Sequence, residues 1–145
     1  MIAAFVVVLV GASVAAQFYF TGASRSAISG ILPTGCVKPA NGFLVILNSD
    51  GYNDSIAHGA PSKWWPVINV QQGQTVNLTV CDADTQAHGF QISHYYDNSI
   101  VTLVPGEVLR VSFVANRIGE FRIYCDIFCA VHIFMQSGLL NVTSA

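Results

Sequence analysis

The sequence predicts an all-β sandwich preceded by one N-terminal transmembrane helix, and three observations lead to this prediction. Hydrophobic residues make up 52% of the 145 residues and charged residues only 10%, which is too apolar for an ordinary soluble domain. The apolar excess gathers at the N-terminus, where no charged side chain precedes Arg25. Beyond residue 42, short apolar stretches alternate with turn-forming residues, which is the pattern of an all-β domain.

Residues 1–24 are predicted to be a membrane anchor. Residues 2–20 read IAAFVVVLVGASVAAQFYF, and a helix over residues 2–22 would span roughly 30 Å, about the thickness of the hydrocarbon core. The aromatic run FYF at its end would lie near one membrane interface. A signal peptide is the alternative, because Ser13-Val14-Ala15 resembles a cleavage site, although no basic segment precedes the apolar stretch.

Residues 25–42 are rich in Gly, Ser, Ala and Pro and are predicted to be a linker, and residues 43–145 are predicted to form the folded domain. The polar stretch over residues 49–63 is expected to be a loop. Seven or so short strands with frequent turns favour an antiparallel sandwich. The predicted strands cover residues 43–47, 67–70, 75–81, 88–96, 107–115, 121–125 and 137–142.

The four cysteines fall into two kinds. Cys36 and Cys81 stand alone in the sequence, whereas Cys125 and Cys129 are close together. A Cys36–Cys81 disulfide would suit an oxidising, extracytoplasmic compartment, and two buried free thiols are the alternative. Three sequons give mild support to the same compartment; they begin at Asn53, Asn77 and Asn141.

The charge pattern argues against a nucleic-acid partner. The net charge is −2, and the six basic residues are scattered rather than clustered. Nothing in the chain resembles a general acid–base pair or an activated nucleophile.

The residues that could bind a metal are concentrated in residues 125–135, which read CDIFCAVHIFM, and His88 lies upstream. Sulfur and imidazole ligands suit copper, zinc or iron–sulfur clusters, and the thioether of Met135 favours copper because zinc sites use Cys and His. Each residue alone has an ordinary alternative: the two cysteines as a disulfide or small buried side chains, His132 and Met135 as core residues. A redox dithiol is less attractive, because the spacing is Cys-x3-Cys.

Three segments resemble the CuA domain of the cytochrome oxidase subunit II family, in its branch with one transmembrane helix. They are AHGFQI at residues 87–92, LVPGE at 103–107 and GEFRIYC at 119–125, and PVINVQQG at 66–73 also fits. The resemblance covers about residues 66–143. It implies a cupredoxin-like Greek-key β-sandwich.

The resemblance also implies a dinuclear copper centre. Its ligands would be two bridging thiolates, two imidazoles, a weak thioether and a weak backbone carbonyl, supplied by Cys125, Cys129, His88, His132, Met135 and Ile127. The chain departs from the family pattern Cys-x3-Cys-x3-His-x2-Met, because only two residues separate Cys129 from His132. The family usually has Glu or Gln at the position of Ile127, where that side chain helps to hold magnesium, so this chain is not expected to supply that link.

The function implied by the resemblance is that of the electron-accepting subunit of a haem–copper terminal oxidase in the respiratory chain. The domain would take electrons from a soluble donor, cytochrome c or a blue copper protein, and pass them to haem in a large membrane subunit I that reduces oxygen. The chain itself would only transfer electrons, from the extracytoplasmic side of the cell membrane. Electrons would enter near Trp64 and Trp65, for which ordinary packing is the alternative, and His58 and His94 are expected not to bind metal.

Three rival interpretations stay open. The short Cys129–His132 spacing also suits a membrane-tethered mononuclear cupredoxin that carries electrons alone. A copper-binding assembly protein would hold the metal without redox cycling. The copper domain of a nitrous oxide reductase is the third, although 145 residues leave no room for the rest of that enzyme.

Overall fold

The computed structural model describes residues 31–53 and 65–145. The predicted anchor, the first part of the predicted linker, His58 and Trp64 lie outside these residues. Within the described part of the chain, no helix is long and apolar enough to cross a membrane.

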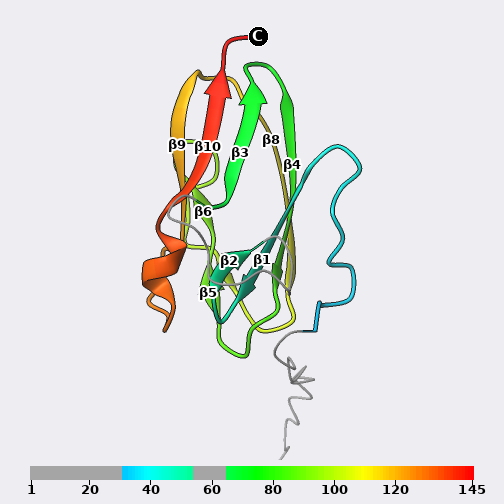
Figure 1. Cartoon of the computed structure of the whole chain (residues 1–145), viewed down its shortest axis with the longest axis vertical. Helices are drawn as coiled ribbons and strands as arrows, with labels where there is room; N and C mark the ends of the chain where they lie inside the picture. The colour runs from blue at the N-terminus through cyan, green and yellow to red at the C-terminus, as the bar shows by residue number, and fades with distance from the viewer. Residues whose placement is uncertain (1–30, 54–64) are drawn as a thin grey trace, which may run out of the picture.

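The described residues form a sandwich of two four-stranded sheets (Figure 1). The first sheet has the order β2-β1-β4-β8, the second has the order β3-β10-β9-β6, and β5 pairs with β7 separately. A short 3-10 helix, η1 (His132–Met135), precedes the last strand. The strands are β1 (Phe43–Asn48), β2 (Gly51–Asn53), β3 (Val67–Gln71), β4 (Thr75–Asp82), β5 (His88–Gly89), β6 (Gln91–Ile92), β7 (Thr102–Leu103), β8 (Val108–Val114), β9 (Gly119–Tyr124) and β10 (Gly138–Thr143).

The sheets are mixed rather than purely antiparallel, which corrects the prediction from the sequence. Strand β1 runs parallel to β4, and β3 runs parallel to β10, while β4 with β8 and β9 with β10 are antiparallel. Both parallel pairs join strands that are not consecutive in the chain. Short-range turn signals show where a strand ends but not which distant strand lies beside it, so the pairing could not be read from them.

Two further segments differ from the prediction. The expected loop over residues 49–63 contains β2, whose Tyr52 is fully buried. The expected strand over residues 88–96 is divided into β5 and β6, followed by a turn. These three strands have only two or three residues each, too few to show a period of two in the sequence.

The hydrophobic core fills the space between the two sheets. Strand β4 shows how the sequence builds it, since Val76, Leu78 and Val80 alternate with more polar residues and are all buried. A smaller cluster lies where Cys36 and Cys81 form a disulfide, with Ile46 and Ala83 around it. Residue 36 belongs to the predicted linker, so this part of the linker is held against the domain.

Candidate metal centre

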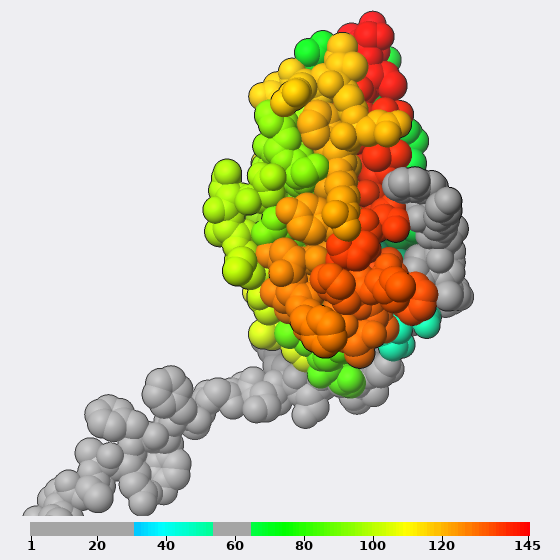
Figure 2. Space-filling model, turned by 90° about the vertical axis from the view of Figure 1, so that its left-hand side faces the viewer, coloured from blue at the N-terminus to red at the C-terminus, as the bar shows by residue number. Residues whose placement is uncertain are grey.

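The candidate site is built on the loop between β9 and β10, residues 125–137. The loop is closed at its base, because the N–H of Cys125 donates to the carbonyl of Met135 at 2.9 Å. A tighter turn lies inside it, where the N–H of His132 donates to the carbonyl of Cys129 at 3.1 Å and η1 begins. These two backbone bonds fold the loop back on itself. In Figure 2 the orange segments that include this loop lie at the surface of the lower part of the molecule.

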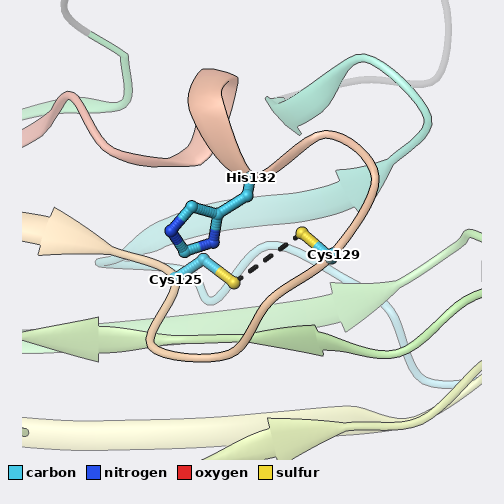
Figure 3. A group of neighbouring side chains, drawn as sticks. All are labelled: Cys125, Cys129 and His132. Carbon is cyan, nitrogen blue, oxygen red and sulfur yellow. Dashed lines mark hydrogen bonds between the residues drawn. The ribbon is translucent and has the colours of Figure 1, made fainter.

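Three sulfur atoms meet inside the loop. Sγ of Cys125 lies 3.9 Å from Sγ of Cys129 (Figure 3). Sγ of Cys129 in turn lies 3.9 Å from Sδ of Met135. All three side chains are buried. Burial, and then the nearby Cys125, raises the pKa of the Cys129 thiol. Two thiols this close resist ionising together, so a bound cation is what would stabilise both as thiolates.

His132 completes a cluster with the two cysteines. One ring nitrogen of His132 and the two Sγ atoms all lie within 4.8 Å of one another. Nδ1 of His132 is 2.8 Å from the carbonyl oxygen of Ile127, and that oxygen is 3.1 Å from Sγ of Cys125. The carbonyl predicted to be a weak ligand therefore points into the same space as the thiols and the imidazole.

His88 lies on β5 and is not one of the three residues whose donor atoms lie within 4.8 Å of one another. Its side chain is fully buried, and its Nε2 lies 2.9 Å from Oδ2 of Asp84. Burial lowers the pKa of His88, opposed in part by Asp84, so the ring is held neutral. Burial also raises the pKa of the Asp84 carboxyl, but hydrogen bonds from Thr85, His88 and Gln86 outweigh it, and that pKa lies below its usual value.

The donor set fits a copper centre, and the state of His88 supports this. With the carboxylate of Asp84 accepting the Nε2–H, the lone pair of the neutral ring is on Nδ1. Nδ1 is buried and has no hydrogen-bond partner among the residues that the structure describes. A histidine that donates one ring N–H to a carboxylate while its other nitrogen is free is the arrangement that metal-binding histidines adopt. Two thiols, a thioether and imidazoles are ligands that copper prefers.

The backbone of Gly89 in β5 contacts both the ligand loop and β2. The N–H of Gly89 donates to Sγ of Cys125 at 3.2 Å, and the carbonyl of Gly89 accepts from the hydroxyl of Tyr52 at 2.8 Å. Burial, and then the charges of Cys125 and Asp126, raises the pKa of Tyr52 well above its usual value, so it stays a donor. The first sulfur of the loop and the strand of His88 are thus joined directly.

Asp126 anchors the loop on the side of β6. Its Oδ2 accepts from Nε2 of Gln91 at 2.6 Å and from the N–H of Val101 at 3.2 Å. The hydroxyl of Tyr124 donates to Oε1 of Gln91 at 2.8 Å, which fixes that amide in turn. These bonds hold the residue between Cys125 and Ile127 in place.

The outer surface of the loop is apolar. Phe128 is 95% exposed and its ring stacks on His132 with 6.3 Å between ring centroids. Ile133 and Phe134, on η1, are also exposed. The stretch from Ile127 to Met135 contains no acidic or basic residue other than His132. We call Phe128, Ile133 and Phe134 the apolar surface of the loop.

The remaining predicted residues lie outside the cluster. Trp65 precedes β3, is half-buried and packs against the main core. Its neighbour Pro66 accepts from the N–H of Leu139 in β10, the strand that follows the ligand loop. The ring of His94 stacks on Phe121 with 5.5 Å between centroids.

Sequence reasoning missed the residues that hold the ligands in place: Asp84, Gln86, Gln91, Asp126 and Tyr52. The one signal for them was the spacing Asp84-x3-His88, a carboxylate close to a predicted ligand. The others act through contacts between segments far apart in the chain.

Comparisons with known proteins match this chain to parts of two kinds of protein, nitrous-oxide reductase and cytochrome c oxidase subunit 2. No protein-family model matches the chain. It is 32% identical over 100 residues to a nitrous-oxide reductase of Ralstonia nicotianae, covering 66% of this chain and 15% of that protein. It is 34% identical over 64 residues to cytochrome c oxidase subunit 2 of Thermus thermophilus, covering 44% of this chain and 45% of that protein. The chain thus spans less than half of either relative.

Among solved structures, a haem–copper terminal oxidase dimer matches with a TM-score of 0.54 and 19% identity, over 70% of this chain and 63% of that chain. This likeness establishes the fold, and the predicted all-β, cupredoxin-like sandwich is confirmed. The resemblance noted in the sequence is also confirmed by the oxidase relatives. Over part of its length, the chain is therefore a distant homologue of cytochrome c oxidase subunit 2 of Thermus thermophilus.

Proposed function

We propose that the chain is the electron-accepting subunit of a haem–copper terminal oxidase, with a dinuclear copper centre in the loop between β9 and β10. The observation that carries the proposal is the meeting of Cys125, Cys129 and His132, whose donor atoms lie within 4.8 Å of one another. The homology to oxidase subunit 2 supports the same assignment.

The chain's own residues supply the ligands in this proposal. Cys125, Cys129, His88 and His132 would be the main ligands of the copper ions, and Met135 and the carbonyl of Ile127 would be weaker ones. When bound, a sulfur-bridged copper pair takes up and releases one electron with little change in geometry. The buried thiols and the closed loop exclude water and fix the ligand positions before the metal arrives.

The proposed arrangement in the cell follows from the anchor. Residues 1–24 cross the cell membrane, residues 25–42 link the anchor to the domain, and residues 43–145 lie on the extracytoplasmic side. The disulfide between Cys36 and Cys81 suits that oxidising side. A large haem-bearing subunit I in the membrane is the proposed electron acceptor, and oxygen reduction takes place there.

We place the electron donor at the apolar surface of the loop. Phe128 is almost fully exposed and stacks on His132, a proposed ligand. In a partner protein that covers Phe128, the contacting atoms would be separated from His132 only by the Phe128 ring. Exposed apolar side chains grouped around a site are typical of protein contact surfaces. Trp64 and Trp65 stay a second proposal for the point at which electrons enter.

A lone mononuclear carrier is the second candidate function. The observation in its favour is that only two residues separate Cys129 from His132, while His88 is outside the group whose donor atoms lie within 4.8 Å. A copper domain of a larger reductase is a third, favoured by the nitrous-oxide reductase match, which covers 66% of this chain.

Purification of the full chain from its native membranes separates the first two of these candidates. The oxidase proposal predicts that a haem-bearing, many-helix subunit copurifies with the chain and that the complex consumes oxygen. A chain that is isolated alone, with copper and without haem, would support the carrier and contradict the oxidase.

A further inference from the structure

The short segment between Cys129 and His132 is held by a side chain from outside the ligand loop. This segment consists of Ala130 and Val131 and is one residue shorter than the spacing expected from the resemblance. The N–H of Ala130 donates a hydrogen bond to Oε1 of Gln86, with 3.0 Å between the two atoms. Gln86 lies just before β5, 44 residues upstream, so the bond joins two distant segments.

The other end of the same amide contacts the carboxylate that holds His88. Nε2 of Gln86 donates to Oδ2 of Asp84 at 3.1 Å. The same Oδ2 atom lies 2.9 Å from Nε2 of His88. One glutamine side chain therefore spans the gap between the ligand loop and the Asp84–His88 pair.

Asp84 is a fixed point in this chain of bonds. It is 3% exposed, and its Oδ1 accepts from the N–H of Thr85 at 2.6 Å. Its own N–H donates to Oδ1 of Asp82 at 2.9 Å. Because the carboxylate is held from several directions, a shift of the loop at Ala130 cannot be absorbed by moving Asp84 alone.

The position requires an amide, with its acceptor and its donor at opposite sides. Ala130 presents an N–H and needs an acceptor, whereas the carboxylate of Asp84 needs a donor. Glutamate at residue 86 would keep the acceptor but would place a second negative charge beside Asp84. Leucine would have a similar size but neither hydrogen-bonding group.

We propose that Gln86 is a positioning residue that fixes the short Cys129–His132 segment to the Asp84–His88 pair. The bridge keeps the ligands of the loop at a constant position relative to His88. The bridge itself is a property of the chain; its role toward copper rests on the function proposed above. Without the bridge, the segment that precedes His132 loses its direct link to the Asp84–His88 pair.

Hydrogen exchange and NMR of the full chain in its copper(I) form, which is diamagnetic, test the bridge. In Gln86→Leu, the amide of Ala130 is expected to exchange at least about fivefold faster, the effect of losing one hydrogen bond of ordinary strength. The ring signals of His88 and His132 are expected to shift, and the EPR spectrum of the oxidised variant is expected to broaden. In Gln86→Glu, Ala130 keeps its acceptor and its protection, while the signals of His88 shift.

The matched control is Gln72→Leu. Gln72 also uses its side-chain amide for one bond, Nε2 to the carbonyl of Asn116 at 3.1 Å, in the turns beyond β3 and β8. This variant is expected to leave the signals of Ala130, His88 and His132 unchanged. If Gln86→Leu matches wild type in all three, the bridge is not a positioning device, even if copper binds normally. If wild type binds no copper, the function proposed above fails, and the exchange of Ala130 in the metal-free chain still tests the bridge.

Discussion

The backbone N–H of Gly89 donates a hydrogen bond to Sγ of Cys125, with 3.2 Å between the two atoms. Only glycine permits this approach, because a Cβ at residue 89 would lie 2.7 Å from the backbone nitrogen of Asp126. We predict that Gly89→Ala pushes β5 away from the loop and lowers copper affinity by roughly tenfold, as losses of outer contacts do at metal sites. Competition with a copper chelator measures this directly.

A second glycine separates this effect from general destabilisation. Gly73 has a φ of +86°, and a Cβ there would meet nothing within 4 Å. Gly73→Ala should cost about 1–2 kcal/mol of stability through its left-handed backbone and leave copper affinity unchanged. Equal losses of affinity in the two variants would contradict a specific role for Gly89.

The disulfide between Cys36 and Cys81 should be a main source of stability. It joins residues 45 apart in the sequence, and a cross-link of that span is worth about 4 kcal/mol in the chain-entropy account. The double variant Cys36→Ser with Cys81→Ser should therefore unfold at much lower urea concentration. Its copper content at low temperature should match wild type, because the ligand loop contains neither cysteine; a loss of copper without a loss of stability would contradict this assignment.

Asp82 should make the domain less stable as the pH rises. Burial raises the pKa of its carboxyl from 3.8 to about 7, opposed by the N–H of Asp84 and reinforced by the charges of Asp84 and Glu107. Between these two values the folded state binds more protons than the unfolded state, so the free energy of unfolding falls as the pH increases through this range. Urea titrations across it should show wild type losing stability relative to Asp82→Asn. A difference independent of pH would show that Asp82 does not titrate in this way.

The apolar surface of the loop should govern the reaction with the electron donor. Replacing Phe128 and Ile133 with Ser should lower the rate constant for reduction by the donor at least about tenfold, because exposed anchors at the centre of a contact surface contribute on the order of 1–2 kcal/mol each. Copper content and the EPR spectrum should not change. Stopped-flow measurements at two salt concentrations should show little salt dependence, since Phe128, Ile133 and Phe134 carry no charge.

A control for that variant is Ile118→Ser. Ile118 is 53% exposed and precedes β9, so it lies at the opposite end of that strand from Cys125. It should leave the donor reaction unchanged. If Ile118→Ser slows the reaction as much as the loop variants, the donor does not dock at the loop.

The two tryptophans are tested separately. Trp64→Ala or Trp65→Ala should slow reduction by the donor while copper is retained, if electrons enter near them. Unchanged turnover in both variants would leave Trp65 with the packing role that its contact with the core already shows.

The strands with clear alternation were predictable from the sequence, because a period of two is a local property. Val76, Leu78 and Val80 marked β4, and Phe121 and Ile123 marked β9, which leads directly into Cys125. The ligand loop could also be located, since all of its metal-binding side-chain types lie within residues 125–135. These predictions needed no knowledge of which segments meet in space.

The surroundings of the site could not be predicted in the same way. Tyr52 lies in a polar stretch that looks like a loop, and it becomes a buried strand residue only because β1 pairs with it and Gly89 accepts its hydroxyl. Gln86 has no distinctive sequence context, and its role depends on an Ala130 amide 44 residues away. The parallel pairings of β1 with β4 and β3 with β10 likewise depend on long-range contacts.

Copper content per chain, measured together with the EPR spectrum of the oxidised protein, tests the central claim most directly. We expect two copper ions per chain that share one delocalised unpaired electron, because two thiols, two imidazoles, a thioether and a carbonyl are available to bind a pair. One copper ion per chain with a four-line mononuclear spectrum would contradict it, and would show that the short Cys129–His132 segment builds a single-copper site.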